Sequence, residues 1–185
     1  MQKNIYLTGF MGTGKSTVGG LLSVRLGIPF VDTDVQIELT MGLPIDKIFA
    51  KKGGEDLFRE NEREVLNRLR FRAPLVVACG GGMILSILNR EVLREGIWIN
   101  LKASPATIMD RIGLNQSHPV ASHLVASRPL LGKKVKREEV ENLLLKRQPY
   151  YELAPHQVGT DGLSPEGVLT PVLKIVLTQI LRVGV

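Results

Sequence analysis

Gly9–Ser16, which reads G-F-M-G-T-G-K-S, decides the fold of this chain. It matches every fixed position of the pattern G-x-x-x-x-G-K-[ST]. The apolar residues Ile5–Leu7 precede it as a short strand, and Lys15–Leu26 follow it as a helix that stops at Gly27. Glycines let backbone N–H groups turn inward around phosphate oxygens, and the helix N-terminus adds a partial positive charge. The motif therefore predicts a loop that binds the phosphates of a nucleoside triphosphate.

The side chains of this motif have distinct predicted roles. Lys15 supplies a full positive charge to the β- and γ-phosphates, and the Ser16 hydroxyl is placed to bind Mg²⁺. The residues expected to contact ATP are Gly12, Thr13, Gly14, Lys15, Ser16 and Thr17. The alternative is a glycine-rich turn that a lysine follows by chance, and the strand and helix around the motif argue against it.

Short apolar runs alternate with helical patterns along the rest of the chain. Strands are expected at 5–7, 29–32, 75–79, 97–101 and 157–160. Helices are expected at 15–26, 55–70, 89–95, from 105 onward, at 137–153 and at 165–182. Pro149 is expected to bend or end one helix, and Pro171 to interrupt another. This alternation predicts a single α/β domain over residues 1–185 with a parallel sheet, in which ligands bind beyond the carboxyl ends of the strands.

The composition limits the classes of function that remain. The 185 residues include 24 Lys+Arg and 18 Asp+Glu, which gives a net charge of +6. Because Cys79 is the only cysteine, an internal disulfide framework and a cysteine-based zinc site are excluded, and a reducing compartment is expected. No apolar stretch is long enough to span a membrane, and the N-terminus lacks the pattern of a signal peptide. We therefore expect a soluble, cytoplasmic protein.

The net positive charge points to an anionic partner, either nucleic acid or a small anion. The strongest basic cluster, Lys133–Arg137, is followed at once by Glu138 and Glu139, which weakens a polyanion-binding interpretation. Aromatic residues make up only 5% of the chain, too few for an evident base-stacking surface. A non-catalytic nucleic-acid-binding module is therefore disfavoured.

Two carboxylates follow the second predicted strand, in the run Asp32-Thr33-Asp34. One carboxylate there can support Mg²⁺, and the other can take a proton from an attacking hydroxyl. The alternative is that Asp32 or Thr33 only caps the next helix.

Three glycines, Gly80–Gly82, end the most apolar strand. Such a run favours a backbone that approaches a ligand closely, although a tight turn would also explain it. Arg59 lies at the edge of the apolar face of its predicted helix, and Arg147 on the side of its helix that should be buried, where a guanidinium needs a carboxylate or phosphate partner. Each arginine could instead form a structural ion pair, and Glu62, one turn after Arg59, is placed to orient it.

Arg128 stands in the run R-P-L-L at the end of the aperiodic segment 113–132. Phosphoryl transfer requires the exclusion of water and the neutralisation of developing charge, and a mobile loop that carries an arginine supplies both. An ordinary surface loop is the alternative.

Taken together, these motifs resemble those of the shikimate kinases over nearly the whole chain. The motifs are G-F-M-G-T-G-K-S at 9–16, D-T-D at 32–34, G-E-D-L-F-R-E-N-E at 54–62, G-G-G at 80–82, R-P-L-L at 128–131 and K-R-Q-P-Y-Y at 146–151. The resemblance implies transfer of the γ-phosphoryl group of ATP to the 3-hydroxyl of shikimate, a step in aromatic amino-acid biosynthesis through chorismate. It also implies a P-loop kinase fold, with a five-stranded parallel sheet, helices on both faces and a mobile lid.

The resemblance assigns roles to individual positions. It implies that shikimate is bound by Asp34, Arg59, Gly81, Gly82 and Arg147, within a region that includes residues 33–62. It implies that catalysis depends on Asp34, Lys15 and Arg128, and that Ser16 and Asp32 hold Mg²⁺. It places Arg128 on the ATP phosphates and Arg111 beside the adenine. The expected partners are shikimate and ATP. The protein is expected to be a monomer that binds neither nucleic acid nor membrane.

The chain departs from the family pattern in two places. The segment 112–127, within an expected lid at about 112–132, is longer than is typical, and 160–165 lacks an arginine that some relatives carry in the adenine loop. A second hypothesis is another small-metabolite kinase on the same scaffold, such as a gluconate kinase. Such an enzyme has no need for Arg59 and Arg147 to converge on one carboxylate.

Overall fold

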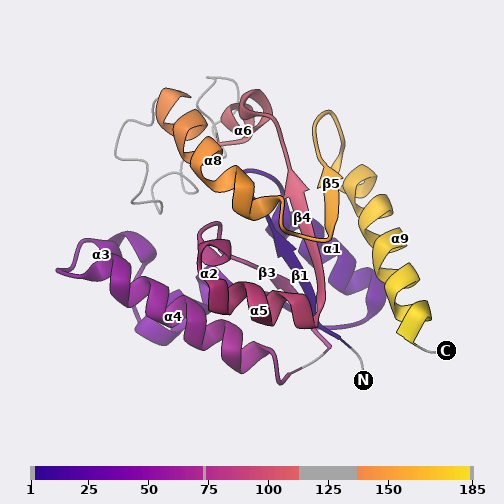
Figure 1. Cartoon of the computed structure of the whole chain (residues 1–185), viewed down its shortest axis with the longest axis horizontal. Coiled ribbons are helices and arrows are strands. Elements are labelled where there is room, and N and C mark those ends of the chain that lie inside the picture. The colour runs from indigo at the N-terminus through magenta and orange to yellow at the C-terminus, as the bar shows by residue number, and fades with distance from the viewer. Residues whose placement is uncertain (1–2, 73, 113–136, 184–185) are drawn as a thin grey trace.

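The computed structural model describes residues 3–72, 74–112 and 137–183, and a five-stranded parallel sheet runs through its centre (Figure 1). The strands are β1 (Ile5–Thr8), β2 (Phe30–Asp32), β3 (Val76–Ala78), β4 (Ile97–Lys102) and β5 (His156–Gly159). Their order is β2-β3-β1-β4-β5, and every neighbouring pair is parallel. The predicted α/β fold with a five-stranded parallel sheet is confirmed.

Helices cover both faces of the sheet, as predicted. They are α1 (Lys15–Leu26), α2 (Thr33–Met41), α3 (Ile45–Phe49), α4 (Gly54–Leu69), the short 3₁₀ helix η1 (Met83–Leu85), α5 (Ile87–Glu95), α6 (Pro105–Arg111), α8 (Arg137–Tyr151) and α9 (Pro165–Val183). The buried side chains of α1 and α9 pack together against one face, and those of α4, α5 and α8 pack against the other.

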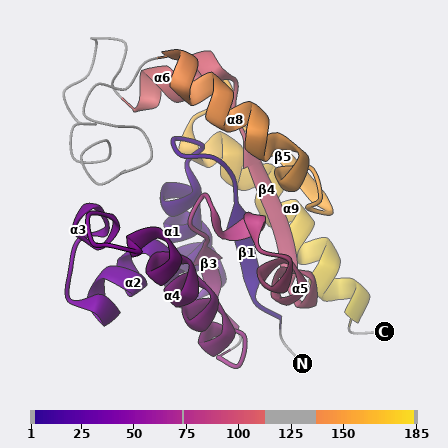
Figure 2. The ribbon, with the colours of Figure 1, turned by 60° about the vertical axis from the view of Figure 1, so that its left-hand side comes forward.

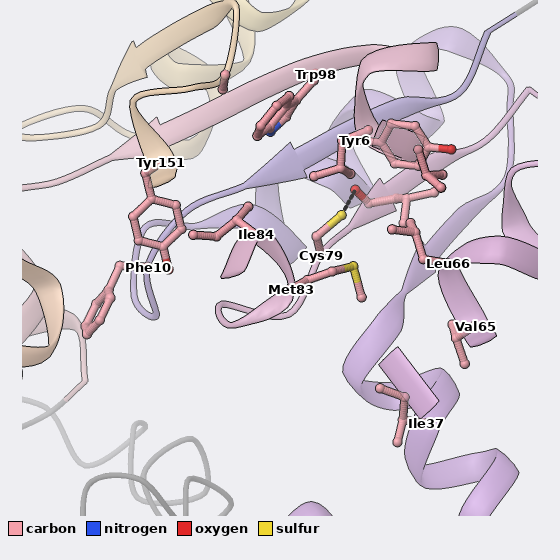
Figure 3. Close-up of a cluster of buried hydrophobic side chains, with 14 of the residues drawn as sticks. Tyr6, Phe10, Ile37, Val65, Leu66, Cys79, Met83, Ile84, Trp98 and Tyr151 are labelled. Carbon is pink, nitrogen blue, oxygen red and sulfur yellow. Dashed lines mark hydrogen bonds between the residues drawn. The ribbon is translucent and has the colours of Figure 1, made fainter. Parts of the chain in front are cut away.

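The central strands β1, β3 and β4 are buried and largely apolar because both of their faces are covered. Successive side chains of a strand point to opposite faces, so Ile5 and Leu7 join the core under α1 and α9, whereas Tyr6 joins the core under α4, α5 and α8. In the same way Trp98 of β4 belongs to the second core. Figure 3 shows this second core, with Trp98 and Tyr6 beside the sheet.

Two proline predictions have different outcomes. Pro149 lies inside α8, which continues past it and ends two residues later at Tyr151, so the helix does not end at Pro149, and the bend stays a prediction. The prediction that Pro171 interrupts the final helix is wrong, because α9 continues through it to Val183. Pro171 removes one backbone donor, but Val172 and Val176 on the same helix are fully buried against the sheet, and this packing keeps the helix continuous.

The strand order decides which loops meet at the carboxyl edge of the sheet. β1 leads into the phosphate-binding loop, and its neighbour β3 leads into Gly80–Gly82. β2, on the other side of β3, leads into Asp32–Asp34. Figure 2 shows α4 and α8 on opposite sides of the loops that follow β1 and β3. Three motifs that are far apart in sequence therefore lie side by side in the fold.

Candidate active site

The phosphate-binding loop connects β1 to α1 and depends on glycine conformations. Gly12 and Gly14 adopt φ values of 76° and 93°, in the left-handed region that side chains other than glycine avoid. Lys15 begins α1 and folds back over the loop, where its Nζ donates to Gly9 O at 2.8 Å and to Phe10 O at 2.9 Å. The lysine charge is thus held over the loop that the motif predicts to bind phosphates.

A pocket of about 380 Å³ opens beside this loop. Its lining includes every residue of the predicted ATP-binding run from Gly12 to Thr17, together with Arg111. The other lining residues are Val18, Thr160, Leu163, Pro165 and Val168. The segment 160–165, which the resemblance places in the adenine loop, thus contributes Thr160, Leu163 and Pro165 to the lining. Val168, on the following helix, was not predicted from the sequence.

Arg111 joins two walls of the pocket. Its guanidinium donates to Gly12 O at 3.2 Å, to Thr160 Oγ1 at 2.9 Å and to Thr160 O at 2.7 Å. The next residue, Asp161, accepts from the backbone N–H of Ser104 at 2.9 Å, so the segment after β5 is also tied to the start of α6. Hydrogen bonds to Thr107 and Ser104 lower the pKa of Asp161.

Asp32 makes two hydrogen bonds at the end of β2, one with the backbone of α2 and one with the phosphate-binding loop. Its Oδ1 accepts from the Asp34 N–H at 3.0 Å and caps α2, as a helix N-cap does. Its Oδ2 accepts from the Ser16 hydroxyl at 2.6 Å, which joins the end of β2 to the phosphate-binding loop. Two oxygen ligands of the kind that Mg²⁺ prefers are therefore adjacent at the edge of the pocket.

The glycine run after β3 accepts one hydrogen bond from, and donates another to, side chains of two helices. The Gly80 N–H donates to Thr33 Oγ1 at 2.8 Å, and the Tyr151 hydroxyl donates to Gly81 O at 2.7 Å. A Cβ at Gly80 would lie 3.3 Å from Cγ of Asp34, and one at Gly82 would lie 2.7 Å from Cζ of Arg59. The glycines therefore leave room for two of the predicted shikimate-binding side chains.

Arg59 lies on α4 with its guanidinium between two carboxylates. It contacts Glu62 at 2.7 Å and Glu55 at 3.3 Å, and it lies over the ring of Phe58. Glu62 is 1% exposed, and burial raises its pKa to about 7 although Arg59 acts in the opposite direction; Asp34 raises it further. The prediction that Glu62 orients Arg59 is consistent with this geometry.

Arg147, on α8, approaches the glycine run from the other side. It is 6% exposed, and its Nη1 lies 3.6 Å from the Cβ position of Gly81. Within the part of the chain that the structure describes, no hydrogen bond of this guanidinium is present. Gly9 O lies 3.7 Å from the same Cβ position and accepts from Lys15 Nζ. The structure thus brings both predicted arginines, the glycine run and the lysine-bearing loop together.

Some predicted residues lie outside the described ranges. Arg128 and the expected lid, except Ile112, belong to residues 113–136. The sequence indicates Thr33 only as a possible helix cap, and Tyr151 only as part of the run K-R-Q-P-Y-Y. The one available signal for Tyr151 was its position four residues after Arg147, which places both side chains on one face of a helix.

Two kinds of feature are absent from the described residues. Within these ranges, no group of three or more His, Cys, Asp or Glu side chains is arranged to hold a metal ion. None of the described helices combines the length and apolar character that a membrane span requires.

Comparison with known proteins identifies the family. The family model "Shikimate kinase" matches residues 11–177. The shikimate kinase of Moorella thermoacetica is 42% identical, over 88% of this chain and 87% of its own, and that of Thermodesulfovibrio yellowstonii is 40% identical, over 93% and 94%. Among solved structures, the shikimate kinase of Acinetobacter baumannii in complex with shikimate superposes with a TM-score of 0.85 at 35% identity, covering 97% of this chain and 95% of that one. The chain therefore belongs to the shikimate kinase family.

Proposed function

We propose that this chain transfers the γ-phosphoryl group of ATP to the 3-hydroxyl of shikimate, which yields shikimate 3-phosphate and ADP, in the biosynthesis of chorismate and the aromatic amino acids. One observation carries the residue assignment: Arg59 from α4 and Arg147 from α8 reach the same glycine run, next to the loop that holds Lys15. Two guanidinium groups at one small site suit a carboxylate, because each can donate two parallel hydrogen bonds to it. Family membership supports shikimate as the acid that carries this carboxylate.

The acceptor is held by groups on three helices and by the glycine run after β3. Arg59 and Arg147 bind its carboxylate, and Asp34 accepts hydrogen bonds from its hydroxyls. The backbone of Gly81 and Gly82 contacts it directly, since these residues carry no side chain that would block the approach. Glu62 keeps the guanidinium of Arg59 in place.

Chemistry at this site is an in-line displacement at the γ-phosphorus. The 3-oxygen of shikimate forms a bond to the γ-phosphorus, and its proton passes to the Asp34 carboxylate. The bond from the γ-phosphorus to the bridging oxygen breaks, and its electron pair leaves with ADP. Lys15, aided by Arg128, stabilises the negative charge on the transferring group and the leaving oxygens.

ATP occupies the pocket beside the phosphate-binding loop. Its phosphates accept from the backbone N–H groups of Gly12–Thr17, and its adenine lies near Arg111 and the apolar side chain of Leu163. Because the loop after β5 carries no arginine, the base is held there by backbone and apolar contacts.

Ser16 and Asp32 fit a magnesium ion. Their oxygens are already paired at 2.6 Å, and Mg²⁺ usually takes one or two protein oxygens together with phosphate oxygens and water. A bound Mg²⁺ would supply positive charge to the β- and γ-phosphates.

Organisation beyond the site is part of the same proposal. Residues 1–185 form one kinase domain, with residues 33–62 in acceptor binding and about 112–132 as the lid. The proposed active species is a monomer. The buried thiol of Cys79 and the use of ATP support a location in the cytoplasm.

The test compares two variants with a wild type assayed on shikimate, gluconate and nucleoside monophosphates. Arg147→Ala should raise the KM for shikimate about 10- to 150-fold, as the loss of a charge-assisted contact of about 1.5–3 kcal/mol implies, with little change in the KM for ATP. Lys15→Ala should abolish transfer without unfolding the protein. Arg25→Ala, at an exposed position of α1, is the control and should change neither KM.

Clear outcomes would contradict the proposal. A wild type that phosphorylates gluconate or a nucleotide but not shikimate would overturn the activity. Equal increases in both KM values for Arg147→Ala would make this arginine structural, and near-normal turnover by Lys15→Ala would contradict the role of the phosphate-binding loop.

A further inference from the structure

Tyr151 contacts the acceptor side of the site without a role assigned to it so far. It is the last residue of α8, one helical turn after Arg147, and it is 5% exposed. Its hydroxyl donates to Gly81 O at 2.7 Å, across 70 positions of sequence. Figure 3 shows Tyr151 with Phe10 and Ile84 at one end of the core, so its ring is held by packing.

This hydrogen bond restrains one particular peptide group. In a trans peptide the carbonyl and the following N–H point in opposite directions. A carbonyl of Gly81 that is fixed toward Tyr151 therefore fixes the N–H of Gly82 on the opposite side. The preceding part of the run is fixed as well, because the Gly80 N–H donates to Thr33 Oγ1.

The N–H groups of this turn are available to a ligand. Neither the Gly81 N–H nor the Gly82 N–H donates a hydrogen bond to any residue that the structure describes, and the Gly82 backbone is buried. A buried N–H without an acceptor is costly, so such a group commonly faces a ligand or an ordered water. The guanidinium of Arg59 lies directly against Gly82, at the place assigned above to the acceptor.

We propose that Tyr151 is a positioning residue for the acceptor: its hydroxyl holds the Gly81–Gly82 peptide in the orientation that presents the Gly82 N–H to shikimate. This inference rests on the proposed function. Because Arg147 and Tyr151 share one face of α8, the same helix both binds the acceptor and orients the turn beneath it.

The test uses two variants with the same chemical change at neighbouring positions. Tyr151→Phe removes only the hydroxyl, and we expect the KM for shikimate to rise about 2- to 13-fold, the effect of one hydrogen bond worth about 0.5–1.5 kcal/mol, while the KM for ATP is unchanged. Tyr150→Phe is the control, since Tyr150 is 37% exposed and its ring lies against Arg90. That variant should match the wild type in both KM values.

A second measurement separates positioning from structural support. The amide signal of Gly82 in a ¹⁵N–¹H spectrum should move on addition of shikimate to the wild type and to Tyr150→Phe, and much less for Tyr151→Phe. A lower Tm for Tyr151→Phe with both KM values and the Gly82 response unchanged would overturn the inference, as would an equal rise in both KM values. A wild type that is inactive on shikimate would overturn the proposed function itself, and this inference with it.

Discussion

Gly82→Ala is the sharpest single test of how the glycine run serves the acceptor side. Gly82 has φ −95° and ψ −10°, a conformation that alanine adopts without strain. The only consequence of the added methyl group is therefore steric. It would lie 2.7 Å from Cζ and 2.8 Å from Nη2 of Arg59, with Nη1 closer still.

The size of the effect follows from these distances. Ordinary contacts between such atoms are about 3.5 Å or longer, so the guanidinium must withdraw by about 1 Å. Because it is the far end of a flexible side chain, this movement costs the fold little. It does displace the guanidinium from the acceptor, and a lost charge-assisted hydrogen bond of about 1.5–3 kcal/mol corresponds to a rise of about 10- to 150-fold in the KM for shikimate.

The assay is steady-state phosphorylation of shikimate with each substrate varied in turn. The KM for ATP should stay within about 2-fold, and the Tm should change little. Gly20→Ala is the matched control, because a Cβ at Gly20 meets no atom within 4 Å and alanine is favoured inside helix α1. It should leave the KM for shikimate unchanged.

A double-mutant cycle identifies the cause. If Gly82→Ala acts through Arg59, it should have almost no further effect in an Arg59→Ala background. Full additivity of the two substitutions would refute the steric argument, and so would an unchanged KM for shikimate in Gly82→Ala alone.

Two further predictions follow from titratable groups at the edges of the site. Glu62→Gln should flatten the pH dependence of stability. Since burial raises the pKa of Glu62 from 4.5 to about 7, the folded protein binds this proton more tightly than the unfolded chain. The contribution of Glu62 to the free energy of unfolding should therefore be fullest below pH 4.5 and be lost as the pH rises through 7. Urea unfolding at pH 4.5 and pH 8 measures the free energy of unfolding of the wild type and of Glu62→Gln. An equal change with pH in both proteins would contradict the prediction. Asp161→Asn weakens the hydrogen bond to the Ser104 N–H, which is worth under about 1 kcal/mol. The KM for ATP should therefore rise about 2- to 5-fold, and the KM for shikimate should not change. A rise in the KM for shikimate alone would argue against a role of Asp161 in the nucleotide pocket.

The sequence predicts best what depends on neighbouring residues. The phosphate-binding loop, its strand and its helix are adjacent along the chain, and α1 begins at Lys15 and ends at Leu26 as expected. Arg147 was predicted to lie on a buried helix side from apolar spacing alone, and it is buried. Local periodicity is sufficient for such inferences because it fixes which side of a helix faces the core.

Contacts across the sheet were not predictable in the same way. The bond from the Gly80 N–H to Thr33 joins positions 47 apart, and that from Tyr151 to Gly81 O joins positions 70 apart. Periodicity indicates that a side chain is buried, but the atom that it meets depends on strand order and on how far each helix is shifted along its axis. Pro171 shows the opposite failure, since a strong local signal was overridden by tertiary packing.

Because β1 lies between β3 and β4, the phosphate-binding loop that follows it stands between two groups of loops. In the proposed function, the loops after β2 and β3, on one side of it, carry residues assigned to acceptor binding. The segments after β4 and β5, on the other side, line the pocket assigned to ATP with Arg111, Thr160 and Leu163. Neighbouring strands are spaced at about 4.8 Å, so the backbone itself sets the separation of donor and acceptor. Selection can therefore alter the preference for one metabolite through the loops after β2 and β3 while the ATP half of the scaffold is kept intact.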